Sequence, residues 1–237
     1  MSIYFSKIFT ALLFGIALIA AISCSKINNS IETVAAEARD SSTNQKPVAL
    51  PTPSTNSKGE QTAVFAGGCF WGLEAVFEHV KGVSDVTSGY SGGAKKTADY
   101  ETVSTGTTGH AESVKIIYDP SQVSYEQLLK VFFSVAHDPT QLNRQTPDTG
   151  TQYRSAIFFS TEEQKRLAEN YINELTKAKT YPQPVVTQVV PLEAFYKAED
   201  YHQNYLAQHP NQPYIVAYDQ PKVENLQKQF PDLYVSK

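Results

Sequence analysis

We expect an α+β domain from this sequence: a two-layer α/β sandwich on a ferredoxin-like split βαβ core, with a mainly antiparallel or mixed sheet. The main observation is the order of segments after residue 60, where strand, helix, strand, strand, helix and strand patterns follow one another. A further helix, strand and helix follow these six. A chain of 237 residues is long enough to bury a core of this kind.

These elements are read from apolar periodicity and from turn residues. The stretch TAVFAG is a short apolar run closed by glycines and indicates a buried strand. In the helix that follows, Phe70, Leu73, Phe77 and Val80 recur at helical spacing. The expected elements are a strand at 62–67, a helix at 69–80, strands at 83–90 and 111–118, a helix at 124–136, a strand at 154–160, a helix after residue 160, a strand at 184–190 and a helix at 199–208.

Two of the helix starts carry the residues of a capping box. Ser124 is followed by Gln127, and Ser160 by Glu163. In this pattern each side chain accepts a hydrogen bond from the backbone N–H of the other residue, which stabilises the first turn. We therefore expect helices to begin at both places.

Residues 1–23 read as a secretory signal of the lipoprotein type. The apolar run at 8–22, preceded by Lys7, is short for a membrane span of about 18–20 residues but fits a signal sequence. The run ends in AISC, where small residues also suit ordinary secretion without lipid. Because Cys24 directly follows a small residue, we expect it to carry lipid. The protein is then exported to the cell envelope or periplasm and anchored to a membrane.

The rest of the chain divides into three parts. Residues 24–60, rich in Ser, Thr, Asn, Ala and Pro, are expected to form a flexible tether. We expect a catalytic domain at 61–220 and a C-terminal tail at 221–237. The net charge of −4 gives no electrostatic case for nucleic-acid binding. We expect a monomer.

The stretch GGCFWG at 67–72 places the domain's one cysteine, Cys69, where a strand passes into a helix. A helix start favours an anion and can lower the pKa of a cysteine. The three glycines would leave space for another molecule to approach the sulfur, and Phe70 and Trp71 could form an apolar wall. The alternative is that Cys69 is simply a small buried hydrophobic residue.

A second informative stretch is GHAESVKIIYD at 109–119. Strand alternation puts Glu112 on one face with Val114 and Ile116, the side expected to meet the core. A carboxyl group in apolar surroundings has a raised pKa and can donate a proton near neutral pH. The alternative is an edge-strand glutamate in water.

Three further polar residues lie on loops or strand ends, where ligands are often bound. Asp148 and Tyr153 belong to the stretch PDTGTQYRS, and Tyr100 follows the second strand. Spacing alone assigns none of them a role.

The sequence predicts no metal site, because the five histidines form no pair at ligand spacing and Cys69 has no cysteine partner. A Cys-His acyl hydrolase or transferase is the competing enzyme class. His79 lies about 15 Å along the helix from Cys69 at 1.5 Å per residue, too far for a partner. His110 and His137 could approach only through the fold.

With these segments in place, the chain resembles the peptide methionine sulfoxide reductases of the A type over roughly residues 62–218. The matching stretches are GGCFWGLE, SGYSGG, TGHAESVKIIYDP, HDPTQLNRQTPDTGTQYRS and AEDYHQNYL, in family order. The resemblance implies an enzyme that reduces the S epimer of methionine sulfoxide, free or in proteins, with no metal or bound organic cofactor.

The resemblance also implies a role for each site residue. Cys69 matches the nucleophile that takes the oxygen as a sulfenic acid, and Glu112 matches the proton donor. Tyr100 and Tyr153 match hydroxyls that hydrogen-bond around that oxygen. The other matches are Phe70 and Trp71 to a pocket for the S-methyl group, and Asp148 to a polar contact at its rim.

The chain departs from many family members, which regenerate the thiol with further cysteines. Ser104 stands where some members have one, and no cysteine follows Cys69. We therefore expect re-reduction by an external thiol: a thioredoxin- or glutaredoxin-like partner, or dithiothreitol in vitro. The leading hypothesis is an enzyme that repairs oxidised cell-envelope proteins. The alternatives are the Cys-His hydrolase and a non-catalytic surface lipoprotein.

Overall fold

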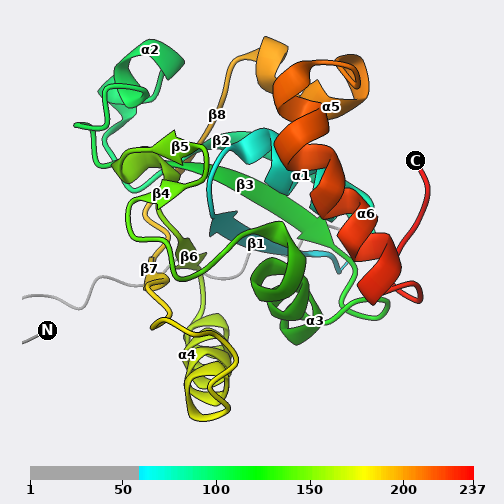
Figure 1. Ribbon diagram of the computed structural model, residues 1–237. Helices are drawn as coiled ribbons and strands as arrows, with labels where there is room; N and C mark the ends of the chain where they lie inside the picture. Colours follow the sequence, from blue (N-terminus) through cyan, green and yellow to red (C-terminus); the bar gives the residue numbers. More distant parts are fainter. Residues whose placement is uncertain (1–58) are drawn as a thin grey trace, which may run out of the picture. The chain divides into compact units, whose positions relative to one another are not determined.

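A six-stranded mixed sheet forms the centre of the domain (Figure 1). The computed structural model describes residues 59–237, so the expected signal sequence, Cys24 and most of the tether lie outside the described residues. The strands lie in the order β7-β6-β1-β3-β2-β8. Their bounds are β1 Gln61–Ala66, β2 Val83–Ser91, β3 Ala111–Tyr118, β6 Ala156–Phe159, β7 Gln188–Pro191 and β8 Phe195–Lys197.

The inner four strands have the predicted ferredoxin-like arrangement. Strand β1 lies between β3 and β6 and is antiparallel to both, and β3 is antiparallel to β2. Helix α1 (Phe70–Glu78) connects β1 to β2, and the chain from β3 to β6 passes through α3 (Tyr125–Val131). The prediction of an α+β fold with a mainly antiparallel or mixed sheet is confirmed.

The sheet has two further strands at its edges, and one of them makes it mixed. Strand β7 is parallel to β6, and it occupies only the end of the strand expected at 184–190. Strand β8 is antiparallel to β2 and was not predicted, because its three residues are too short for a periodic pattern.

Both faces of the sheet are covered, and β1 shows this most directly. Ala63 and Phe65 belong to the large core beneath helices α1 and α3, whereas Val64 and Ala66 belong to a smaller core on the opposite face. Successive side chains of a strand point to opposite faces. A continuous apolar run is therefore what a strand buried on both sides requires.

The capping pattern predicts one helix start correctly and misplaces the other. At α3, the Gln127 backbone N–H donates to Ser124 Oγ at 3.2 Å, and the Ser124 N–H donates to Gln127 Oε1 at 2.8 Å. At α4 (Glu162–Lys177) the N-cap is Thr161, which accepts from the Gln164 N–H. The box expected at Ser160 is therefore wrong by one residue.

Two expected helices differ in shape from the prediction. The helix expected at 124–136 ends as α3 and continues as a π-helical turn, Phe132–Ala136. The helix expected at 199–208 is broken into a 3₁₀ turn, Asp200–His202, and the short α5, Tyr205–Gln208. Asn204 has a φ of 52° between them, a left-handed conformation that cannot continue a right-handed helix.

The segment expected as a tail, 221–237, is part of the folded domain. It contains α6 (Gln220–Gln229), which packs beside α1 (Figure 1). Leu226 is fully buried, and Val223 and Phe230 pack against the same core. The domain therefore extends beyond residue 220. In the part of the chain that the structure describes, no helix is both long and apolar enough to cross a membrane.

Candidate active site

The turn between β1 and α1 and the first turn of α1 pack closely against other segments of the protein. A Cβ on Gly68, which has a φ of 95°, would lie 2.6 Å from the Gln145 side chain. A Cβ on Gly72 would lie 2.2 Å from Asp219 Oδ1. These glycines are thus required by contacts within the fold, and the interpretation that they leave space for a ligand at the sulfur is wrong.

Cys69 is the N-cap residue of α1, as its position after a strand predicted, and it is 8% exposed. Its pKa is raised, not lowered. Burial is the main cause, followed by the charges of Glu112 and Asp219; the Trp71 backbone N–H and Lys222 act in the opposite direction but more weakly. The resting pocket therefore holds a thiol.

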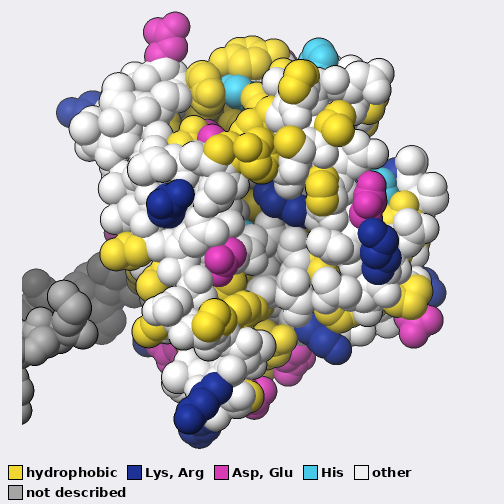
Figure 2. Space-filling model, viewed as in Figure 1, with side chains coloured by type: hydrophobic (Ala, Val, Ile, Leu, Met, Phe, Trp, Pro, Cys, Tyr) yellow, Lys and Arg dark blue, Asp and Glu magenta, His cyan; other side chains and the backbone are white. Residues whose placement is uncertain are grey.

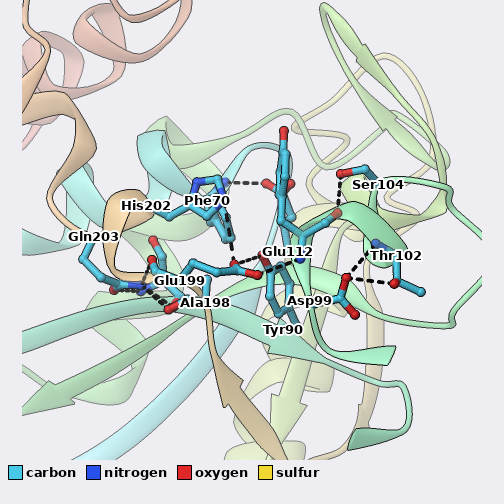
Figure 3. Close-up of polar contacts among 12 residues, drawn as sticks. Phe70, Tyr90, Asp99, Thr102, Ser104, Glu112, Ala198, Glu199, His202 and Gln203 are labelled. Carbon is cyan, nitrogen blue, oxygen red and sulfur yellow. Dashed lines mark hydrogen bonds and ion pairs between the residues drawn. The ribbon is translucent and has the colours of Figure 1, made fainter. Parts of the chain in front are cut away.

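Glu112 lies on β3 and is 2% exposed. Its Oε2 accepts the backbone N–H of Phe70, the first residue of α1, at 3.1 Å (Figure 3). Burial raises the pKa of Glu112 to about 8, although the Phe70 N–H opposes this shift. Glu112 is therefore a carboxylic acid at neutral pH, held next to the residue that carries the thiol. The interpretation as a water-exposed edge residue is excluded.

Phe70 and Trp71 form an aromatic wall that is fixed by other rings. The Trp71 indole N–H donates to His202 Nδ1 at 3.2 Å. The Trp71 ring stacks on Tyr205, with centroids 3.8 Å apart and planes 7° apart. The Phe70 ring centroid lies 4.9 Å from that of His202. Because His202 contacts both the Phe70 ring and the Trp71 ring, it fixes their relative position.

Tyr100 and Tyr153 reach the same pocket from two separate turns. Tyr100 begins α2 (Tyr100–Val103), and its backbone N–H donates to Glu199 Oε1 at 2.9 Å. Tyr153 ends the 3₁₀ turn Thr151–Tyr153. Burial, followed by the charge of Glu112, raises the pKa of both tyrosines. Both hydroxyls therefore remain protonated and can donate hydrogen bonds.

Asp148 lies on β5 (Asp148–Thr149), which pairs with β4 (Arg144–Gln145) in a small hairpin. Its Oδ2 accepts a hydrogen bond from the hydroxyl of Tyr214. Tyr214 directly precedes the π-helical turn Ile215–Asp219, and its ring stands perpendicular to Trp71. Sequence reasoning missed Tyr214; the high tyrosine content was the only signal, and it did not distinguish this residue.

The structure brings all of the predicted pocket residues together, around a cavity of about 180 Å³. Figure 2 shows hydrophobic side chains gathered on this face between the positions of α2 and α5. The cavity is lined by Cys69, Phe70, Trp71, Tyr100, Glu112, Asp148, Tyr153 and Tyr214.

His110 and His137, the two candidate general bases, point away from the cavity. His110 Nε2 lies 3.1 Å from the Ala94 carbonyl oxygen, and His137 Nε2 lies 2.7 Å from Ser155 Oγ. Neither lines the cavity. The geometry therefore disfavours a Cys-His hydrolase. Within residues 59–237 no cluster of three or more His, Cys, Asp or Glu side chains is arranged to hold a metal ion.

A buried thiol facing a neutral carboxylic acid and phenolic hydroxyls defines a cysteine-dependent enzyme on an α+β scaffold. The family model described as peptide methionine sulfoxide reductase matches residues 61–234. The chain belongs to this family, in its A type, and is an oxidoreductase.

Individual relatives agree with this assignment. Peptide methionine sulfoxide reductase MsrA 2 of Mesorhizobium japonicum is 62% identical over 179 residues, covering 76% of this chain and 92% of the relative. MsrA of Deinococcus radiodurans is 48% identical, covering 76% and 90%.

Solved structures agree as well. Reduced Mxr1 of Saccharomyces cerevisiae matches with a TM-score of 0.63 at 30% identity, covering 68% of this chain and 92% of that one. Methionine sulfoxide reductase A of Corynebacterium diphtheriae matches with a TM-score of 0.57 at 35% identity, covering 69% and 85%.

Proposed function

We propose that this protein reduces methionine S-sulfoxide, free or in proteins, by oxygen transfer to Cys69. The Cys69 sulfur attacks the sulfoxide sulfur while Glu112 donates its proton to the sulfoxide oxygen. The S–O bond of the substrate breaks as the oxygen passes to the Cys69 sulfur, and the proton of the thiol restores Glu112. The products are a cysteine sulfenic acid and methionine, and the atoms balance. The sulfoxide is the oxidant and Cys69 is oxidised.

The other lining residues bind and orient the substrate in this proposal. The hydroxyls of Tyr100 and Tyr153 donate hydrogen bonds to the oxygen as negative charge develops on it. Phe70 and Trp71 receive the S-methyl group against their rings. Asp148, held by Tyr214, supplies a polar contact at the rim of the pocket.

The observation that carries the proposal is the protonated Glu112 held beside the thiol. A sulfoxide is uncharged, and its oxygen leaves sulfur only when the developing negative charge is neutralised. A carboxyl with a pKa of about 8, next to a thiol and in contact with the first N–H of α1, can deliver that proton at neutral pH.

We further propose that a thiol outside the domain regenerates the enzyme. Cys69 is the one free cysteine of the described residues, and the sequence holds two cysteines in all. Two external thiols reduce the sulfenic acid to the Cys69 thiol and release a disulfide and water. A thioredoxin- or glutaredoxin-like protein suits this role. Ser104 gives no alternative, because a hydroxyl cannot form a disulfide with Cys69.

The proposed location is the cell envelope, with a lipid on Cys24. This part of the proposal rests on the sequence of residues 1–24 and places the repair of oxidised methionine in exported proteins. Mass spectrometry of the mature N-terminus tests it: a lipidated Cys24 supports it, and an unprocessed Met1 contradicts it.

The decisive experiment compares the wild type with Cys69→Ser in reducing each epimer of methionine sulfoxide with dithiothreitol. We expect the wild type to consume the S epimer only and Cys69→Ser to be inactive. Dimedone should label Cys69 after incubation with substrate and without other oxidants. Full activity of Cys69→Ser would overturn the proposal, and a wild type that binds the sulfoxide without turnover would favour the non-catalytic alternative.

A further inference from the structure

Asp219 is a fully buried acid that the proposed reaction does not use. Burial raises its pKa, and the Lys222 ammonium opposes that shift. It ends the π-helical turn before α6, and its Oδ1 accepts from Lys222 Nζ at 3.0 Å. Its Oδ2 is also buried and has no hydrogen-bond partner among the described residues. Burying a charge with one oxygen unsatisfied lowers stability. The burial of Asp219 beside Lys222 therefore does not follow from a gain in stability.

This ion pair lies directly against the first turn of α1. A Cβ at Gly72, three residues after Cys69, would meet Asp219 Oδ1 at 2.2 Å and Lys222 Nζ at 2.7 Å. Only glycine at residue 72 allows this approach. Neither Asp219 nor Lys222 lines the cavity, so the pair lies behind the helix start and does not touch the substrate.

The charges that face the thiol come from several elements. Glu112 on β3 and Asp219 before α6 raise the pKa of Cys69, and Lys222 on α6 lowers it. Asp219 and Asp148 also raise the pKa of Glu112. The other titratable groups near the thiol are the phenols of Tyr100, Tyr153 and Tyr214, which line the cavity. His137 lies within the field of Lys222, which lowers its pKa.

We propose that the Asp219–Lys222 ion pair adds to burial in setting the charge of the resting pocket: its carboxylate favours the neutral forms of Cys69 and Glu112, and its ammonium limits that effect. Both are positioning residues that act through Cys69 and Glu112. The proposal deepens the function proposed above: a neutral thiol and a neutral carboxylic acid face an uncharged sulfoxide, and the proton for its oxygen is already in place. It also keeps the thiol unreactive toward other electrophiles until a sulfoxide binds.

A charge cycle tests this, with the near-isosteric variants Asp219→Asn and Lys222→Gln and the double variant. The readout is the rate of Cys69 alkylation by iodoacetamide between pH 6 and 11, followed by mass spectrometry of the proteolytic peptide that contains Cys69, which separates it from Cys24. We expect the apparent pKa of Cys69 to fall by about one unit in Asp219→Asn and to rise in Lys222→Gln. The double variant should lie between the two single variants, because the opposite changes partly cancel.

A merely structural pair would give a different result. If both single variants shift alkylation in the same direction, or leave it unchanged while they remain folded by circular dichroism, the proposal is overturned. If Asp219→Asn does not fold, the Lys222→Gln arm decides alone: a rise in pKa supports the proposal and any other result overturns it. Alkylation needs no sulfoxide, so a failure of the proposed function, seen as no sulfoxide reduction by the wild type, is distinguishable.

Discussion

Replacing Glu112 by Gln removes the proton that the pocket stores but preserves the shape of the side chain. The Gln oxygen can still accept the Phe70 N–H, so α1 keeps its first hydrogen bond. The variant therefore separates proton donation from positioning. We expect the reduction step to slow by about 10²- to 10⁴-fold, the usual contribution of a general acid.

The same change has an opposite effect on stability. The pKa of Glu112 rises from 4.5 to about 8 on folding, so the folded state holds a proton that the unfolded state releases in this range. Stability contributed by this group is present below pH 4.5 and is lost as the pH rises toward 8. Between pH 5 and pH 8 the loss amounts to roughly 3 kcal/mol. Glu112→Gln removes this loss and should unfold at higher denaturant concentration than the wild type at pH 8.

The assay is single-turnover release of methionine from excess S-sulfoxide without reductant, as a function of pH. The wild type should lose rate above about pH 8, and Glu112→Gln should be slow without that alkaline limb. Glu74→Gln is the matched control, because Glu74 is also buried with a pKa of about 8 but does not line the cavity. A wild-type alkaline limb that survives in Glu112→Gln, or disappears in Glu74→Gln, refutes the assignment of Glu112.

Two further predictions concern the C-terminal segment. Tyr214→Phe removes the hydroxyl that holds Asp148. Steady-state kinetics should therefore show a KM raised several-fold and a nearly unchanged kcat, with Tyr218→Phe as the control. An equal KM in both variants would contradict the role of Tyr214. Leu226→Ala should lower the free energy of unfolding by about 2–5 kcal/mol in urea titrations, because a fully buried leucine is lost from the core. A change below about 0.5 kcal/mol would show that α6 does not unfold together with the rest of the domain.

Local patterns predicted the elements and residues whose causes are local. The run at 62–67 and the alternation around Glu112 identify strands of the sheet interior because burial on one or both faces dictates their residue types. The capping box at Ser124 fixes a helix start for the same reason. Cys69 and Glu112 were therefore found from the residues around them, and the family resemblance gave their partners.

The failures have causes distant in the sequence. The helix start alone predicts a lowered pKa for Cys69, but burial and the charges of Glu112 and Asp219 outweigh it, and these groups reach the thiol only through the fold. Tyr214 was missed because it pairs with Asp148, 66 residues away. The segment at 221–237 was read as a tail because its few apolar residues gain their burial from α1 and the core of the sheet.

The hydrogen bond between Tyr214 and Asp148 joins two rims of the cavity, one formed by the β4–β5 hairpin and the other by the segment that leads into α6. A substrate side chain that fills the cavity contacts both rims at once, so binding in the cavity and formation of the Tyr214–Asp148 hydrogen bond are coupled. By thermodynamic linkage, whatever binds there must make α6 harder to detach, and whatever detaches α6 must weaken binding by the same factor. The end of the chain is thus a natural reporter of occupancy: its protection from proteases should increase as the sulfoxide concentration rises.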